Sequence, residues 1–321
     1  MLCTRVLGYM FLTVLWMAGP DIANGQPFPN KVIRIVVGGI GGSLDITARL
    51  VAQGIAGPLG QPVIVENRPT VTIAAEVVAK SPPDGYTLLV TGPNLWILPL
   101  LESKPSYDPT RDFSPVTLAT RSPSILVINP SLPVKSVKEL IALAKARPGD
   151  LNYASGASGS ASHLAAELFR TRAGVNITRI NYKSAAAGLI DLISGQVQLM
   201  FPVAASVAPY IKAGRLRALA VTSREPSKLV PGTPTMAAAG LPDYEAVSIG
   251  GIFGPAHLPD AVTTRLNQEI VRVLTRDDTK EKFLVNGVES VGSSPEELAA
   301  AVKSEMATIG KLVKDAGIRA E

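Results

Sequence analysis

The chain has 321 residues, of which 46% are hydrophobic, 18% are charged and 5% are aromatic. This composition predicts a globular protein with room for two domains, and it excludes a disordered chain. The formal charge of +5 comes from scattered Lys and Arg residues, and with so few aromatic side chains it does not indicate nucleic-acid binding.

Residues 1–25 have the pattern of a secretory signal peptide, which predicts a periplasmic protein. The apolar run at residues 6–18 is too short to span a membrane, and small residues before Gln26 offer a cleavage site. An N-terminal membrane anchor is the alternative reading. The single cysteine, Cys3, precedes the apolar run, so neither a lipid anchor nor a disulfide is expected.

Strands and helices alternate along the chain, which predicts parallel sheets with right-handed crossovers. The expected strands are 31–37, 62–66, 86–91, 125–129, 151–154, 178–182, 198–203, 216–222 and 248–253. The expected helices are 44 to about 57, 73–80, 136–146, 161–172, 185–194, 261–275, 279–286 and 295–316. Residues 226–244 predict a long loop around one short helix.

A glycine-rich loop joins the first strand to the first helix and ends with Gly41, Gly42 and Ser43. Free N–H groups and the positive helix dipole at such a helix start suit a carboxylate or a phosphate. Asp45 in the first helical turn either stabilises the helix start, shielded by Arg49, or pairs with an ammonium group of a ligand. The loop fits neither the dinucleotide fingerprint nor a P-loop.

A second loop of the same kind, at residues 155–160, joins a strand to a helix in the other half of the chain. It offers serine hydroxyls and free N–H groups, and in open α/β sheets such strand ends bind ligands. A flexible surface turn is the alternative. We expect His163, which follows the loop, to be a buried structural histidine.

The sequence does not predict an enzyme, a metal site or a cofactor. A nucleophile elbow requires G-x-S-x-G, and after Gly156, Ser158 and Gly159 the fifth position is Ser160. Two distant histidines and one cysteine give no zinc-ligand spacing.

The chain resembles the Bug family, the extracytoplasmic solute receptors of tripartite tricarboxylate transporters. The resemblance rests on the order and spacing of many short pieces, among them GGSLDITARL, GQPVIVENRP, VAKSPPDGYTLLV, YDPTRDFSPVTL, SHLAAELF, NYKSAAAGLIDLISGQVQLMF and IKAGRLRALAVTS. It implies an α/β, type II periplasmic-binding-protein-like fold with two lobes, a ligand cleft and two crossover hinge segments. Lobe 1 would hold residues 26–125 plus 249–321, and lobe 2 would hold residues 126–248.

The resemblance also implies a set of ligand-binding positions. In this sequence they are Gly41, Gly42, Ser43, Asp45, Thr70, Thr72, Thr91, Gly92, Ser155, Gly159, Ser160 and Ser184. Several pocket positions depart from the family pattern. Thr70-Val71-Thr72 replaces a glycine-rich loop, Gly38-Gly39-Ile40 replaces a stretch with Pro and Phe, and Ser184 stands where glycine is usual.

The resemblance implies a binding protein that captures a small carboxylate: a dicarboxylate, a tricarboxylate, an acidic amino acid or an aromatic acid. It would pass this ligand to membrane transporter subunits. The alternative is a sensory receptor that signals to a membrane partner, and an enzyme on the same scaffold is a third option. Because neither loop contains an arginine, an amide or another neutral ligand also stays open, and a monomer is the default expectation.

Overall fold

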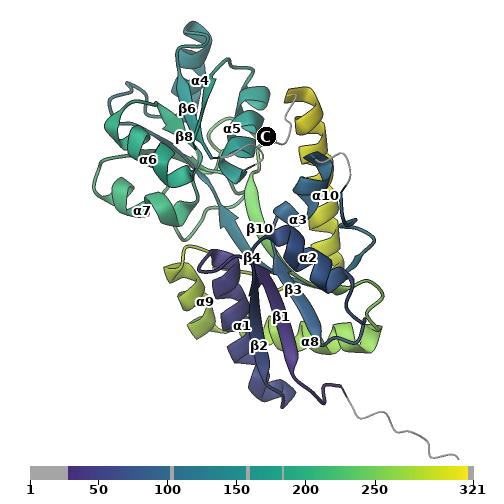
Figure 1. Ribbon diagram of the computed structural model, residues 1–321. Helices are drawn as coiled ribbons and strands as arrows, with labels where there is room; N and C mark the ends of the chain where they lie inside the picture. Colours follow the sequence, from purple (N-terminus) through teal and green to yellow (C-terminus); the bar gives the residue numbers. More distant parts are fainter. Residues whose placement is uncertain (1–27, 102–104, 157–159, 183, 317–321) are drawn as a thin grey trace, which may run out of the picture.

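The computed structural model describes residues 28–101, 105–156, 160–182 and 184–316. The expected signal peptide and Gly159 lie outside these residues. The described chain forms two α/β lobes, each built around its own sheet and joined by long extended segments (Figure 1). No helix in these ranges has both the length and the apolar character needed to cross a bilayer.

The first lobe contains a six-stranded sheet in the order β11-β4-β10-β3-β1-β2. Its strands are β1 (Ile33–Gly38), β2 (Val63–Arg68), β3 (Thr87–Thr91), β4 (Phe113–Pro123), β10 (Val247–Pro255) and β11 (Glu289–Ser290). Strand β1 runs parallel to β2 and β3, as expected, whereas β10 is antiparallel to β3 and β4. Its helices are α1 (Ser43–Leu59), α2 (Val71–Ala79), α3 (Asn94–Leu101), α8 (Asp260–Leu274), α9 (Asp277–Val285) and α10 (Pro295–Ala316).

The second lobe contains a five-stranded sheet in the order β7-β6-β8-β5-β9. Its strands are β5 (Ile125–Ile128), β6 (Asn152–Ser155), β7 (Thr178–Asn181), β8 (Leu199–Met200) and β9 (Arg217–Val221). Strand β6 is parallel to β7 and β8, and β5 is antiparallel to β8 and β9. Its helices are α4 (Val137–Ala146), α5 (Ala161–Ala173), α6 (Ala185–Ser194) and α7 (Ala204–Lys212).

The chain passes between the two sheets at two neighbouring places. Only Ser124 separates β4 from β5, and the return segment enters the first sheet as β10. Buried Thr222 ties the two passages together, because its hydroxyl accepts a hydrogen bond from Ser124 N (2.8 Å) and lies 2.6 Å from the carbonyl oxygen of Ala246. The lobe boundaries at residues 125 and 249 stay a prediction.

The first lobe buries apolar side chains on both faces of its sheet. On one face, Ile35 and Val37 of β1 pack in a cluster with Val51 and Ile55 of α1 and with Ile270 of α8. Burial of each such side chain stabilises the fold by about 1.5–3 kcal/mol. The cluster on the other face continues through α10 to α5, so it includes side chains from both lobes.

Several predictions about elements were wrong. The sequence pattern did not predict α3, β4, α7 or β11, and the described residues between 226 and 244 form turns without a helix. Helix α1 runs on past the expected stop at Gly57-Pro58 to Leu59, where Gly60 (φ 66°) ends it. Pro58 has no backbone N–H to donate within the helix. It lies in the last turn of α1, where only Leu59 follows before Gly60, so little of the helix is disturbed.

Candidate functional site

Two openings lie where the lobes meet. A cleft of about 770 Å³ is lined by residues of both lobes, and a pocket of about 370 Å³ is lined by second-lobe residues and Ser124. Both openings share Ser124, Ser160 and Ala161. The cleft has the size of a small-molecule site, and its place between two lobes is typical of one.

In the first lobe, two loops approach each other closely beside the cleft. A Cβ atom on Gly38 would lie 2.7 Å from backbone atoms of Val71, so only glycine allows the start of α2 to pack against the end of β1. Leu44 and Val71, each in the first turn of its helix, form part of the cleft wall. The predicted residues Gly41, Gly42 and Ser43 are exposed at the start of α1.

Asp45 is buried and holds the glycine loop onto α1 and β2. Its carboxylate accepts hydrogen bonds from Gly41 N (2.9 Å), Asn67 Nδ2 (2.9 Å) and Arg49 Nε (3.2 Å). Burial on its own would raise the pKa of Asp45, but the hydrogen bonds from Asn67, Gly41 and Arg49 outweigh burial and lower it. This geometry favours the structural reading of Asp45 over pairing with a ligand ammonium group.

An Asp45→Asn variant is expected to be about 1–3 kcal/mol less stable at neutral pH, because a neutral amide replaces a carboxylate that accepts three hydrogen bonds. Since the pKa of Asp45 is lowered in the folded protein, its stabilisation is present above the unfolded pKa near 3.8 and is lost as the pH falls through the lower folded value. Urea unfolding at pH 7 and pH 3 measures this. An equal loss of stability at both pH values would contradict the role of the charge.

The other predicted residues of the first lobe lie on the next two loops. Thr70 caps α2, because its hydroxyl accepts a hydrogen bond from Ile73 N, and Thr72 lies in the first turn of α2. The hydroxyl of Thr91 at the end of β3 is buried and has no hydrogen-bond partner within the described ranges. Gly92 follows it and lines the cleft.

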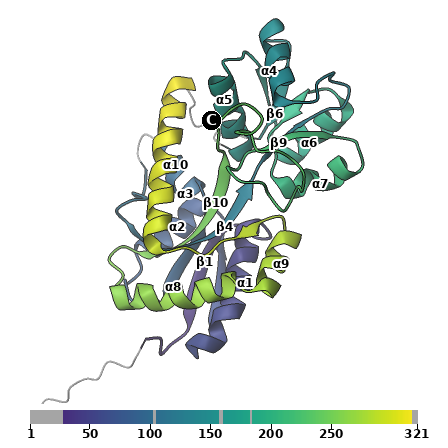
Figure 2. The same ribbon diagram turned by 180° about the vertical axis from the view of Figure 1, so that it is seen from behind.

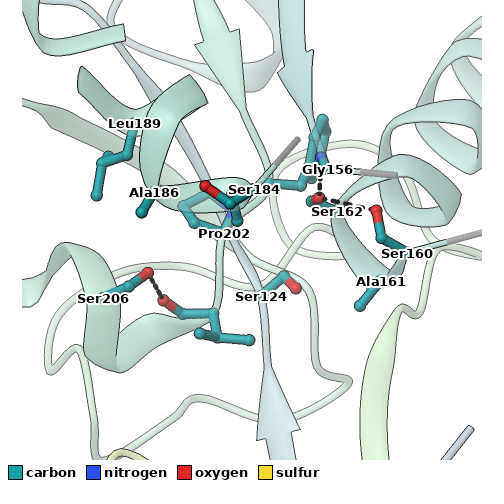
Figure 3. Close-up of a pocket in the computed structure, with 13 residues that line it drawn as sticks. Ser124, Gly156, Ser160, Ala161, Ser162, Ser184, Ala186, Leu189, Pro202 and Ser206 are labelled. Atoms are coloured by element: carbon teal, nitrogen blue, oxygen red, sulfur yellow. Dashed lines mark hydrogen bonds between the residues drawn. The ribbon is translucent and has the colours of Figure 1, made fainter. Parts of the chain in front are cut away.

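In the second lobe, three helices begin at the 370 Å³ pocket (Figure 3). Helix α5 is capped by Ser160 and α6 by Ser184, whose hydroxyls accept from His163 N and Ala187 N, and α7 starts after Val203. The hydroxyl of Ser184 can donate its own proton to a further partner. The hydroxyl of Ser160 also lies 3.3 Å from the hydroxyl of Ser162, and either of the two can be the donor. No charged side chain is among the described residues that line this pocket.

The structure places Ser155 behind the pocket wall. Ser155 is fully buried, and its hydroxyl donates to the carbonyl oxygen of Gly156 and accepts from Arg179 Nε at 2.8 Å. It therefore shapes the loop between β6 and α5. His163 is buried in α5, as expected.

Further residues that line the two openings carry no sequence signal of their own. They are Ser124, Ser162 and Ser206 at the pocket, and Asn94, Arg121, Ser248 and Glu305 at the cleft. Only the position of Ser124 could have pointed to it, because it lies next to residue 125, where the expected lobes meet. The described residues contain no group of His, Cys, Asp and Glu side chains that could hold a metal ion.

Comparisons with known proteins agree with this architecture. The family model described as "Tripartite tricarboxylate transporter family receptor" matches residues 47–318. Protein BugT of Bordetella pertussis is 33% identical over 98% of both chains. A UPF0065 protein from the tcbD-tcbE intergenic region of a Pseudomonas species is 35% identical over 89% of this chain and 86% of its own length.

Solved structures show the same fold. The R. palustris protein Rpa4515, described with adipate, is 37% identical, covers 92% of this chain and 100% of its own, and has a TM-score of 0.75. MatC of Rhodopseudomonas palustris, described with bound malate, is 29% identical with a TM-score of 0.70 over 89% of this chain and 100% of its own. The chain has the two-lobed periplasmic-binding-protein fold and belongs to the tripartite tricarboxylate transporter receptor family, whose members are solute-binding proteins and not enzymes.

Proposed function

We propose that this protein is a periplasmic receptor that captures a small carboxylate between its two lobes and delivers it to a membrane transporter. The observation that carries the proposal is the meeting of three helix starts, those of α5, α6 and α7, at one uncharged pocket. Helix starts present free N–H groups and a positive dipole end, which suit an anion without any cationic side chain.

The chemistry of the pocket supports a carboxylate ligand. Ser160 and Ser184 each use an acceptor site for a helix cap. Their hydroxyl protons can be donated to an anionic oxygen, that of Ser160 when Ser162 is the donor in the bond between these two serines. The cleft adds the starts of α1 and α2 from the first lobe, and closure of the lobes would enclose the ligand between these ends. Relatives described with adipate and malate support the same ligand class.

Thermal unfolding with a panel of ligands tests the proposal. Adipate, malate, citrate and benzoate are compared with adipamide, in which both carboxylates become amides. A carboxylate at about 100-fold its Kd should stabilise the protein by about 2.7 kcal/mol and raise the melting temperature by several degrees. A shift with adipamide and with none of the acids would contradict the assignment of carboxylates.

A Ser160→Ala variant tests the pocket itself. It should weaken binding of the panel's best carboxylate by about 1.5–3 kcal/mol, because a hydrogen bond to a charged group is lost. The matched control is Ser136→Ala, which removes an equivalent N-cap from α4, away from both openings. Both variants lose about 1 kcal/mol of stability with the cap, so only the difference in affinity reports on the site.

The partner is tested in the cell. If deletion of the gene abolishes uptake of the ligand, the receptor feeds a transporter, as the family description supports. If uptake is unchanged while a transcriptional response to the ligand is lost, the partner is a membrane sensor.

A further inference from the structure

Helices α5 and α10 belong to different lobes and face each other across the cleft, and both views show them side by side (Figures 1 and 2). Ala161, Leu164 and Leu168 line the cleft from α5, and Glu305, Thr308 and Leu312 line it from α10. On each helix these positions are spaced three or four residues apart, so each set forms one face. Side chains of both faces, such as Leu164 and Leu312, already belong to one apolar cluster in this structure. Since the two walls belong to different lobes, opening of the cleft would separate these faces.

Glu305 is the acidic side chain on the α10 wall. Burial raises the pKa of Glu305 to about 8, the indole N–H of Trp96 beside it lowers that pKa, and the negative charge of Glu245 raises it further. Trp96 Nε1 is buried and makes no hydrogen bond of normal geometry within the described residues. Trp96 is therefore the group that favours the charged form of the carboxyl, and burial and Glu245 outweigh it.

The remaining charged groups around the cleft do not neutralise Glu305. Glu245, which approaches from the segment before β10, pairs with Arg224 at 2.6 Å. Glu289 of β11 accepts a hydrogen bond from Ser227. Arg121 of β4 and Glu225 also line the cleft, but neither is among the groups that shift the pKa of Glu305.

We propose that closure of the cleft is coupled to proton uptake by Glu305, so that the lobes come together when this carboxyl is neutral and separate when it ionises. Opening exposes the carboxyl to water and moves it away from Glu245, and both changes favour its charged form. Closure does the reverse. This inference deepens the proposed function by assigning a regulatory role at the same cleft.

The distance between the lobes tests the coupling without any ligand. In a Cys3→Ser background, spin labels are attached at Gln53→Cys on α1 and Ala142→Cys on α4, both exposed and in different lobes. Ionisation favours the open form progressively between the ordinary pKa of 4.5 and the raised value of about 8, so the label distance should lengthen within this pH range and level off above it. Glu305→Gln, whose side chain is always neutral, should keep the short distance at every pH.

Two further variants make the distance measurement specific. Glu281→Gln, the same change at an exposed site on α9, should follow the wild type. Glu245→Gln removes the neighbouring negative charge and should move the midpoint to lower pH. A wild-type distance that does not change with pH, or one that changes equally in Glu305→Gln, overturns the proposal.

Calorimetry with adipate adds the effect on binding. If the carboxyl has a pKa of about 8 in the closed form and its ordinary value of 4.5 in the open form, the Kd should rise by up to about tenfold between pH 7 and pH 9, and not at all in Glu305→Gln. An equal rise in both proteins would also overturn the coupling. If adipate and the other acids do not bind at any pH, the proposed ligand class fails, and the distance measurement still decides the role of Glu305.

Discussion

A Glu167→Ala variant is expected to be about 3 kcal/mol less stable at neutral pH and to lose ligand affinity as well. Glu167 is buried on α5, where it accepts a hydrogen bond from the Tyr153 hydroxyl at 2.5 Å and two from Arg170 at 2.7 and 2.9 Å. Breaking a buried pair on one side costs about 3–5 kcal/mol, and the partial exposure of Arg170 places this case at the low end.

The effect should depend on pH in one direction. Burial would raise the pKa of Glu167, but the hydrogen bonds from Arg170 and Tyr153 outweigh it and lower the pKa. The stabilisation is therefore present above the unfolded pKa near 4.5 and is lost as the pH falls through the lower folded value. Urea unfolding of wild type and variant should show a gap at pH 7 that narrows by pH 3.

Tyr153→Phe is the companion variant, because it removes one hydroxyl and leaves the ion pair with Arg170 intact. It should cost about 1 kcal/mol, and the double variant should cost less than the sum of the two single changes. A loss below 1 kcal/mol for Glu167→Ala, or full additivity, would contradict the network. The affinity loss follows because the N-terminal end of the same helix lines both openings.

The local signals in the sequence were sufficient for much of the fold. The helices expected at 136–146, 161–172 and 185–194 are present as α4, α5 and α6. Ser136 caps the start of α4, and Gly174 and Gly195 end α5 and α6 in the left-handed conformation. These features depend on residues within one helical turn, so a sequence pattern contains them. The glycine and serine loops, which are also local patterns, predicted two halves of the candidate site, and this assignment stays a prediction.

Three of the four missed elements, α3, α7 and β4, contain prolines, which interrupt the sequence pattern of a helix or a strand. Pro99 lies within α3, Pro209 within α7, and Pro115 within β4, opposite a register shift of β10 next to Phe253. A proline in a strand usually marks an edge or a bulge, and in a helix it usually marks an end. Tertiary packing stabilises all three segments here, and packing is not visible in a local pattern.

The same limit applies to the charged side chains of the site. The sequence did not single out Glu167 or Glu305, because the pKa of each depends on residues far away in sequence. These include Tyr153 for Glu167 and Trp96 for Glu305. Asp45 was assigned two possible roles, and the hydrogen bond from Asn67, which is distant in sequence, adds to those from Gly41 and Arg49 in favouring the structural one. Contacts between the lobes join residues far apart in sequence, so a local pattern does not contain them.

A Gly287→Ala variant is expected to weaken ligand binding roughly 5- to 150-fold by keeping the lobes apart. Gly287 lies in the turn between α9 and β11 of the first lobe, and a Cβ atom there would lie 1.8 Å from Cβ of Ala205 on α7 of the second lobe. Overpacking of this kind costs about 1–3 kcal/mol. The lobes can relieve it only by moving α7 away, together with Ser206, which lines the pocket.

Backbone strain must be separated from the clash, because Gly287 has a φ of 73° and any other residue is disfavoured there. Gly214→Ala is the matched control: its φ is 69°, but a Cβ atom would meet nothing within 4 Å. Both variants should lose similar stability in thermal unfolding, whereas calorimetry with the best carboxylate should show weaker binding only for Gly287→Ala. Adding Ala205→Gly to that variant removes the nearest contact and should restore part of the affinity. If the single variant binds as tightly as Gly214→Ala, the contact between Gly287 and Ala205 does not limit closure, and the lobes must close about a different axis.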